Sequence, residues 1–318
     1  MKMEKRSVAN ILQEYGALIA LVFLIVVIGA ISPEFRTVNN FLSLIRQSSI
    51  NGFIAFGMTM VILTGGIDLS VGSTLALSAA LCAGMITKGI PVPVAMLVTL
   101  AVGLGLGMLS GVLITKGRLQ PFIATLITMT VYRGMTMIYM NGRPISNLSK
   151  EEYAMSNVLV FFGKGSILGI PVPVILFIIV FVFFFLLLNK TALGRKIYAV
   201  GSNAECAKLA GISIIKIKMF VYSISGLMAG LSGLVLLSRL NSAQPTLGSG
   251  YELDAIASVA LGGTSMNGGR GKITGTLIGI LIIAVLNNGL NILGVSSYYQ
   301  DVVKGIVILI AVLSDKNR

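Results

Sequence analysis

A small set of ionisable and amide side chains lies within, or at the ends of, long apolar stretches. These side chains are the candidates for chemistry in this sequence. Polar groups at membrane depth are costly, so they are normally kept for function or for pairing between helices. The set comprises Arg46, Gln47, Asp68, Arg133, Asn287, Asn288, Asn291, Asp301 and Lys304.

Three of these residues are amides spaced to fall on adjacent faces of one helix. Asn287 and Asn291 are one turn apart, and Asn288 lies beside them. Uncharged donors and acceptors suit a polar neutral solute such as a sugar, and they suit hydrogen bonds between helices equally well. The residues predicted to line a solute path are Asp68, Asn287, Asn288 and Asn291.

Two carboxylates bear on whether transport is driven by an ion gradient. An ion-coupled carrier needs carboxylates near the membrane midplane. Only Asp68 and Asp301 come close, and both are expected at the ends of apolar stretches. This position disfavours ion coupling but leaves it open. Asp301 is three residues from Lys304, and the spacing predicts that the two pair with each other.

The composition argues against several classes of enzyme. The chain has no His, so a Ser/His or Cys/His nucleophile and the usual zinc sets are absent. Cys82 and Cys206 are far apart and do not predict a disulfide. The stretch 268–273 approaches a phosphate-binding loop but has Ile273 where a magnesium-binding hydroxyl is required. We therefore expect no ATPase site, metal or cofactor on this chain.

The amount of charge indicates where the chain resides. Of its 318 residues, 55% are hydrophobic and 11% charged, and the mean hydropathy is +0.94. Soluble domains carry about 25% charged residues. The sequence therefore predicts a single-domain, all-α integral membrane protein, a polytopic bundle of about ten transmembrane helices covering residues 1–318. The expected spans are 17–31, 45–64, 70–87, 92–114, 121–140, 170–188, 217–238, 253–264, 273–294 and 298–313.

The distribution of basic residues predicts the orientation. With ten spans and an inner N-terminus, fifteen of the 24 Lys and Arg residues fall on inner segments, six on outer segments and three within spans. This matches the positive-inside rule and places both termini in the cytoplasm. It also accounts for the net charge of +13 without a nucleic-acid partner.

Glycines one helical turn apart predict close helix packing. They occur as Gly103, Gly107 and Gly111; Gly226 and Gly230; and Gly275 and Gly279. The pairs Gly65-Gly66 and Gly262-Gly263 each follow an apolar run and are expected to end or break helices. These two breaks hint at duplicated halves, but their flanking residues match too poorly to predict a repeat.

The longest inner loop, 189–215, contains a short segment with its own helix signals. Asn203 can cap a short amphipathic helix, Glu205 lies near its positive end, and Gly211 can terminate it. Such a helix, projecting from the inner face, could be gripped by a soluble partner.

At this loop and in three other places, the sequence resembles the permease subunits of bacterial ABC sugar importers of the ribose branch. The resemblance extends over nearly the whole chain. The residues that carry it are Gly65-Gly66-Ile67-Asp68-Leu69-Ser70-Val71-Gly72-Ser73, Glu205-Cys206-Ala207-Lys208-Leu209-Ala210-Gly211, Ser242-Ala243-Gln244-Pro245, Gly250-Tyr251-Glu252-Leu253-Asp254-Ala255-Ile256-Ala257, Leu261-Gly262-Gly263-Thr264-Ser265, Asn287-Asn288-Gly289-Leu290-Asn291 and Ser296-Ser297-Tyr298-Tyr299-Gln300.

The resemblance implies a multi-pass protein of the bacterial inner membrane with four kinds of partner besides the bilayer. These are a second copy of the chain, an ATP-binding cassette subunit that holds ATP and Mg, a periplasmic sugar-binding protein and the sugar. The loop 203–211 matches the pattern that contacts the ATPase, except that Cys206 replaces the usual Ala. The implied coupling residues are Asn203, Glu205, Ala207, Lys208, Leu209 and Gly211.

The outer segments 141–166 and 239–252 are then the expected landing surface for the binding protein. Charged residues there could pair with opposite charges on that partner: Arg143, Glu151, Glu152, Arg239 and Glu252. The sugar expected from the resemblance is D-ribose, moved by alternating access, with another sugar or sugar-like signal molecule as an alternative. The alternative from a different class is a single-chain, ion-coupled sugar carrier.

Overall fold

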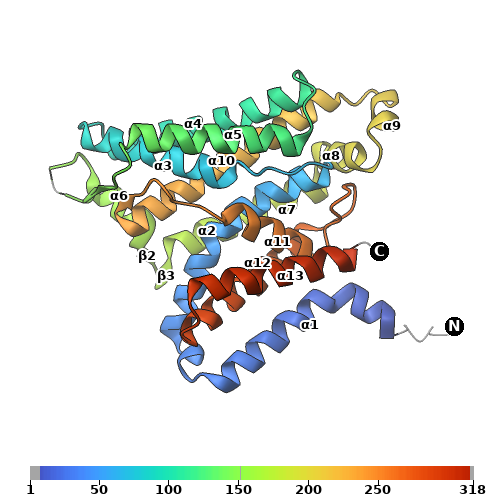
Figure 1. Cartoon of the computed structure of the whole chain (residues 1–318), viewed down its shortest axis with the longest axis horizontal. Helices are drawn as coiled ribbons and strands as arrows, with labels where there is room; N and C mark the ends of the chain where they lie inside the picture. The colour runs from blue at the N-terminus through green and yellow to red at the C-terminus, as the bar shows by residue number, and fades with distance from the viewer. Residues whose placement is uncertain (1–7, 151, 316–318) are drawn as a thin grey trace.

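The computed structural model describes residues 8–150 and 152–315, which fold into a bundle of helices (Figure 1). Apolar runs with few charges form the long helices, because a helix satisfies all its own backbone hydrogen bonds in lipid. The helices are α1 (Val8–Ile31), η1 (Glu34–Arg36), α2 (Val38–Leu63), α3 (Val71–Thr87), α4 (Val92–Thr115), α5 (Pro121–Tyr139), α6 (Ser156–Lys164), α7 (Val172–Lys190), α8 (Ala192–Ser202), α9 (Ala204–Leu209), α10 (Ile214–Leu240), α11 (Tyr251–Leu261), α12 (Ile273–Ile292) and α13 (Ser297–Asp315).

Each of the ten expected segments falls on one of these helices, and the fold is all-α as predicted. Among the described residues, α4, α7, α10 and α12 are long and apolar enough to cross a membrane by themselves. The eighth expected segment corresponds to α11, which has only 11 residues. The basic residues expected near the two termini at 2–6 and 316–318 lie outside the described residues.

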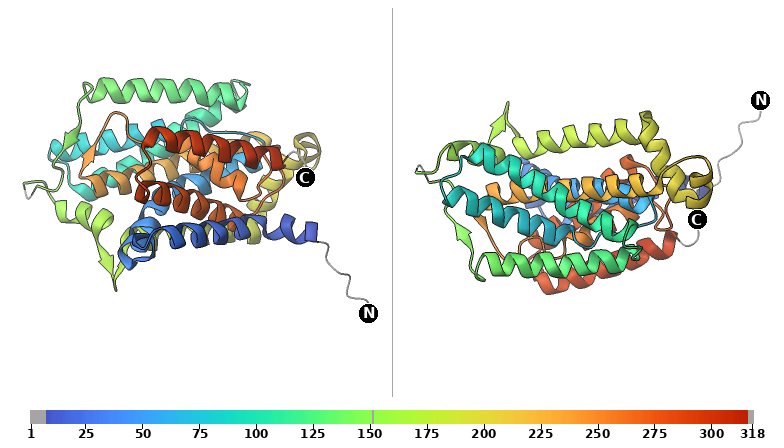
Figure 2. Two further views of the ribbon diagram at one scale, coloured as in Figure 1. Left: turned by 60° about the horizontal axis from the view of Figure 1, so that its bottom comes forward. Right: turned by 90° about the horizontal axis from the view of Figure 1, so that it is seen from above.

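Short strands close one end of the bundle. Strand β1 (Ile145–Ser146) pairs antiparallel with β4 (Ser242–Ala243), and β2 (Ser166–Ile167) pairs with β3 (Ile170–Pro171). The β1–β4 pair joins the two segments predicted to form the outer face. Helices α8 and α9 lie at the opposite end, where both described chain ends are also found (Figures 1 and 2).

Helix α10 occupies the centre and packs most closely on α4. A Cβ on Gly103 would lie 2.6 Å from the Gly226 carbonyl oxygen, and one on Gly107 would lie 2.9 Å from the Gly226 Cα. The backbones can approach this closely only because neither surface carries side chains there. Gly275 and Gly279 likewise lie against α11, at Gly262 and the Ser258 carbonyl. The packing role predicted for these glycines is confirmed.

Candidate functional site

The inner loop 189–215, which contains the segment 203–211 predicted to contact an ATPase, forms two short helices, α8 and α9, at one end of the bundle. The Asn203 side chain accepts a hydrogen bond of 2.9 Å from the Cys206 amide, which caps α9 as expected. Gly211 follows the helix with a φ of +79°, a conformation that glycine adopts without strain. Ala207 is buried, whereas Leu209 is 89% exposed. The helix therefore presents a large apolar side chain outward, together with the exposed Glu205 and Lys208.

Close backbone contacts fix α8 to the rest of the bundle, and sequence reasoning missed them. A Cβ on Gly201 would overlap the Leu63 carbonyl oxygen at the end of α2. That same oxygen accepts a 2.9 Å hydrogen bond from the Gly269 amide. The Tyr198 hydroxyl donates to the Gly271 carbonyl oxygen, also at 2.9 Å. The glycine-rich loop 262–272 thus holds α8 against α2.

From the end of α2, the chain runs inward without helical structure over residues 64–70, and Gly65 has a φ of +73°. Asp68 in this segment is 1% exposed. Its Oδ2 accepts a 2.8 Å hydrogen bond from Ser225, the twelfth of the 27 residues of α10. Asp68 therefore lies near the middle of the bundle, deeper than the helix-end position expected from sequence.

A network of donors satisfies this buried carboxylate. The Ser70 amide and hydroxyl donate to Oδ1 at 3.0 and 2.6 Å. The neighbouring Ile67 carbonyl oxygen accepts from Tyr222 at 3.2 Å and from Thr125 at 3.3 Å. The network ties the inward segment to α5 and α10, which explains the polar residues of this segment without requiring an ion.

Asp68→Ala should lower the free energy of unfolding by about 3 kcal/mol, since three buried donors lose their acceptor. Ser225→Ala removes one of those donors and should cost about 1 kcal/mol. Thermal unfolding of both variants in nanodiscs measures the difference. Equal midpoints for Asp68→Ala and the natural chain would contradict the structural role.

The amides predicted to line a path are mainly engaged between elements. Asn288 and Asn40 of α2 exchange two hydrogen bonds of 3.0 and 2.8 Å. Asn291 accepts a hydrogen bond of 2.9 Å from Gln300 of α13. Asn287 borders a cavity of about 20 Å³ between α2, α11 and α12, where its Oδ1 and that of Asn51 are buried without a protein partner. That volume is large enough for one water molecule but too small for a sugar. A path role for these amides stays a prediction.

The pairing predicted between Asp301 and Lys304 is wrong. Lys304 instead forms an ion pair of 3.2 Å with Asp254 of α11, and Asn51 donates to the same carboxylate at 3.2 Å. Asp254 is 5% exposed, whereas Asp301 is exposed. The buried carboxylate attracts the lysine more strongly because water screens the exposed one.

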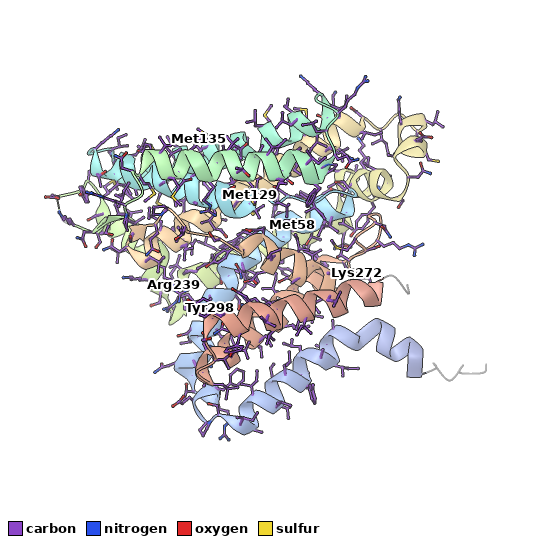
Figure 3. All side chains as sticks on the ribbon, in the orientation of Figure 1. Met58, Met129, Met135, Arg239, Lys272 and Tyr298 are labelled. Atoms are coloured by element: carbon purple, nitrogen blue, oxygen red, sulfur yellow. The ribbon has the colours of Figure 1, made fainter. Side chains whose placement is uncertain are left out.

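The residues predicted to receive a binding protein occupy different places. Arg143 and Glu152 are exposed at the strand-closed end, where Glu152 pairs with Lys150 at 3.2 Å. Arg239 lies near the end of α10 (Figure 3), and the structure leaves it only partly exposed. Glu252 lies deeper, because its carboxylate meets Gly72 at the start of α3. Glu151 lies outside the described residues.

Comparison with known proteins places this architecture in a class. A family model described as "branched-chain amino acid transport system / permease component" matches residues 40–312. The chain belongs to this family of membrane permease components.

Individual relatives match along almost the whole chain. The ribose import permease of Bacillus subtilis (strain 168) is 54% identical over 97% of this chain and 94% of its own length. The ribose import permease of Escherichia coli (strain K12) is 51% identical over 96% of this chain and 95% of its own length. The D-allose transport system permease of the same strain is 42% identical over 95% of this chain and 91% of its own length. No solved structure matches the chain.

Proposed function

We propose that this chain is the membrane-spanning subunit of an ATP-driven importer that moves D-ribose from a periplasmic binding protein into the cytoplasm. The observation that carries the proposal is the 54% identity to a ribose import permease over 97% of the chain. The lower identity of 42% to a D-allose permease favours ribose over allose. The chain lacks a phosphate-binding loop, so ATP and Mg belong to a partner subunit.

The proposed topology has ten spans, formed by α1, α2, α3, α4, α5, α7, α10, α11, α12 and α13, with both termini in the cytoplasm of a bacterial inner membrane. Two observations support it. Both described chain ends lie at one end of the bundle, which requires an even number of crossings (Figure 1). Basic residues also concentrate on the segments assigned to the inner side.

The α8–α9 unit is the proposed contact with the ATP-binding subunit. The exposed Leu209 supplies apolar area that a partner can bury, and Glu205 and Lys208 supply charges around it. Because Gly201 and the loop 262–272 hold α8 against α2, movement of this unit reaches the inward segment at Asp68. The coupling residues proposed from the sequence are therefore joined to the centre of the bundle.

The opposite end is the proposed landing surface for the binding protein, and a second copy of the chain completes the path. Strands β1 and β4 join the two outer segments into one surface that carries Arg143 and Glu152. In the cycle, ATP binding draws the two α8–α9 units together and opens the bundle outward, and hydrolysis resets it. ATP shifts this equilibrium because it binds the closed ATPase arrangement more tightly.

Reconstitution separates this function from the ion-coupled alternative. Labelled ribose uptake is measured in proteoliposomes that contain the chain alone, or the chain with its ATPase and binding protein, with ATP or an ion gradient. We expect uptake only when all three proteins and ATP are present, and unlabelled D-allose should compete poorly. Gradient-driven uptake by the chain alone would overturn the proposal and direct attention to Asp68.

A further inference from the structure

An open hollow lined by apolar and polar groups lies beside α5, where this helix meets the segment leading into α11. Its lining residues are Met129, Thr130, Arg133, Ser249 and Glu252, and its volume is about 310 Å³. We call it the Arg133 hollow. Its volume reaches the lower end of the range for small-molecule sites, about 300–1,000 Å³.

The hollow lies on the side of the bundle, near the middle of its length. Segment 241–250 runs inward from β4, and Gly248 lies against Gly72, the second residue of α3. The Arg133 Nη1 donates to the carbonyl oxygens of Pro245 and Leu247 in this segment, at 2.9 and 2.8 Å. Since α3 follows the inward segment that holds Asp68, Gly72 also lies near mid-bundle. The guanidinium is thus at membrane depth.

The side of the bundle on which the hollow opens carries polar and ionisable side chains as well as apolar ones. Helix α5 forms one edge of the molecule in both views of Figure 2. Figure 3 shows Met129 towards the middle of the molecule and Met135 at its edge. Thr130 and Ser249 are exposed, and Arg133 and Glu252 are partly exposed. Ionisable side chains at this depth face water-filled spaces or protein rather than hydrocarbon.

The chemistry of the lining suits a neutral polyol. A guanidinium has five N–H donors, and two hydrogen bonds on Nη1 leave Nε and Nη2 for a ligand. The Glu252 carboxylate supplies acceptors, and its Oε1 already accepts a hydrogen bond of 3.3 Å from the Gly250 amide. Hydroxyl groups of a sugar both donate and accept, so one sugar can satisfy both residues, whereas a simple ion satisfies only one.

We propose that the Arg133 hollow opens onto the water-filled sugar path, and that Arg133 and Glu252 hydrogen-bond the hydroxyls of the passing sugar. The inference rests on the proposed import function and adds the residues of its path. These differ from the amides predicted from the sequence, which are mainly engaged between helices.

Cysteine accessibility tests the position of the hollow. Thr130→Cys and Ser249→Cys are compared with Met135→Cys, which is 48% exposed in the natural chain and lies on another side of α5. A small, positively charged, membrane-impermeant methanethiosulfonate is added outside vesicles that contain the complete importer. Cys82 and Cys206 are present in every variant, so their reaction is subtracted by measuring the natural chain.

We expect the two hollow cysteines to react at least about tenfold faster than Met135→Cys, because the reagent is excluded from hydrocarbon. Their modification should also block sugar uptake. Equal reaction rates would place the hollow against lipid and overturn the proposal, and so would fast reaction with unimpaired uptake. Labelling rates do not depend on which sugar is carried. If the complete importer fails to move ribose, the proposal that ribose is the substrate is wrong, but the labelling rates still test whether the hollow faces water.

Glu252→Gln tests the contact with sugar itself. It keeps the size of the side chain but weakens the acceptor, so maximal uptake should fall about tenfold, as for one lost hydrogen bond to a charged group. The affinity of the isolated binding protein for sugar should stay the same. Unchanged uptake by Glu252→Gln would show that Glu252 does not contact the sugar during transport.

Discussion

Gly107→Ala should destabilise the folded chain by about 2–3 kcal/mol, although alanine is normally the better helix former. The added Cβ would overlap the Tyr222 carbonyl oxygen and lie 2.9 Å from both the Cα and the nitrogen of Gly226. These obstacles are backbone atoms of α10, which cannot rotate away as a side chain can. Helices α4 and α10 must therefore separate, and the packing along their whole contact loosens.

Gly105→Ala is the matched control, because it lies two residues away on the same helix and its Cβ would meet nothing within 4 Å. It should be neutral, or more stable by up to about 1 kcal/mol from helix propensity. Thermal unfolding midpoints in nanodiscs compare the two variants with the natural chain. If Gly107→Ala is as stable as Gly105→Ala, close approach of the two backbones does not stabilise the bundle.

Glu205→Ala combined with Gly211→Asp should reduce ATP-dependent uptake to below about one tenth, while the chain still folds and inserts. Both positions are exposed on the α8–α9 unit, and the Asn203 cap of α9 is untouched. Asp tolerates the positive φ of residue 211 better than most side chains, at a cost of about 1 kcal/mol. A lost contact residue at a protein interface costs about 2 kcal/mol of binding or more, equivalent to at least about thirtyfold in affinity.

The measurements are uptake by the complete importer and co-purification of the ATP-binding subunit. Lys88→Ala is the control, because this exposed residue follows α3 at the strand-closed end, opposite the α8–α9 unit. It should leave both quantities close to those of the natural chain. Normal uptake by the double variant would show that α9 is not the point of coupling.

Local features were predictable because each depends on residues close together in the sequence. Apolar runs with few charges place the helices, and the Gly65-Gly66 and Gly262-Gly263 pairs begin within two residues of the ends of α2 and α11. The Asn203 cap requires an amide only three residues further on. Glycines one turn apart form a smooth surface on any helix, so close packing could be expected before its partner helix was known.

The positions of the polar side chains could not be predicted in the same way. Lys304 has Asp301 one turn away but pairs with Asp254, and Asn288 pairs with Asn40. The choice depends on which helices are neighbours and how each is rotated. A helical repeat specifies the angle between side chains on one helix, but not the helix that they face.

The sequence by itself determined that this is a helical membrane protein, where its helices lie and what ends them, because hydrophobicity, charge and helix signals act locally. Only the tertiary structure decided the depth of the functional groups. The nonhelical segments 64–70 and 241–250 run inward from opposite ends. Asp68 reaches mid-bundle only because the first of them folds back against α10, and the Arg133 guanidinium gains its carbonyl partners only because the second folds back against α3 and α5. Depth is a property of the packed bundle, since it is set by contacts between residues more than 100 positions apart.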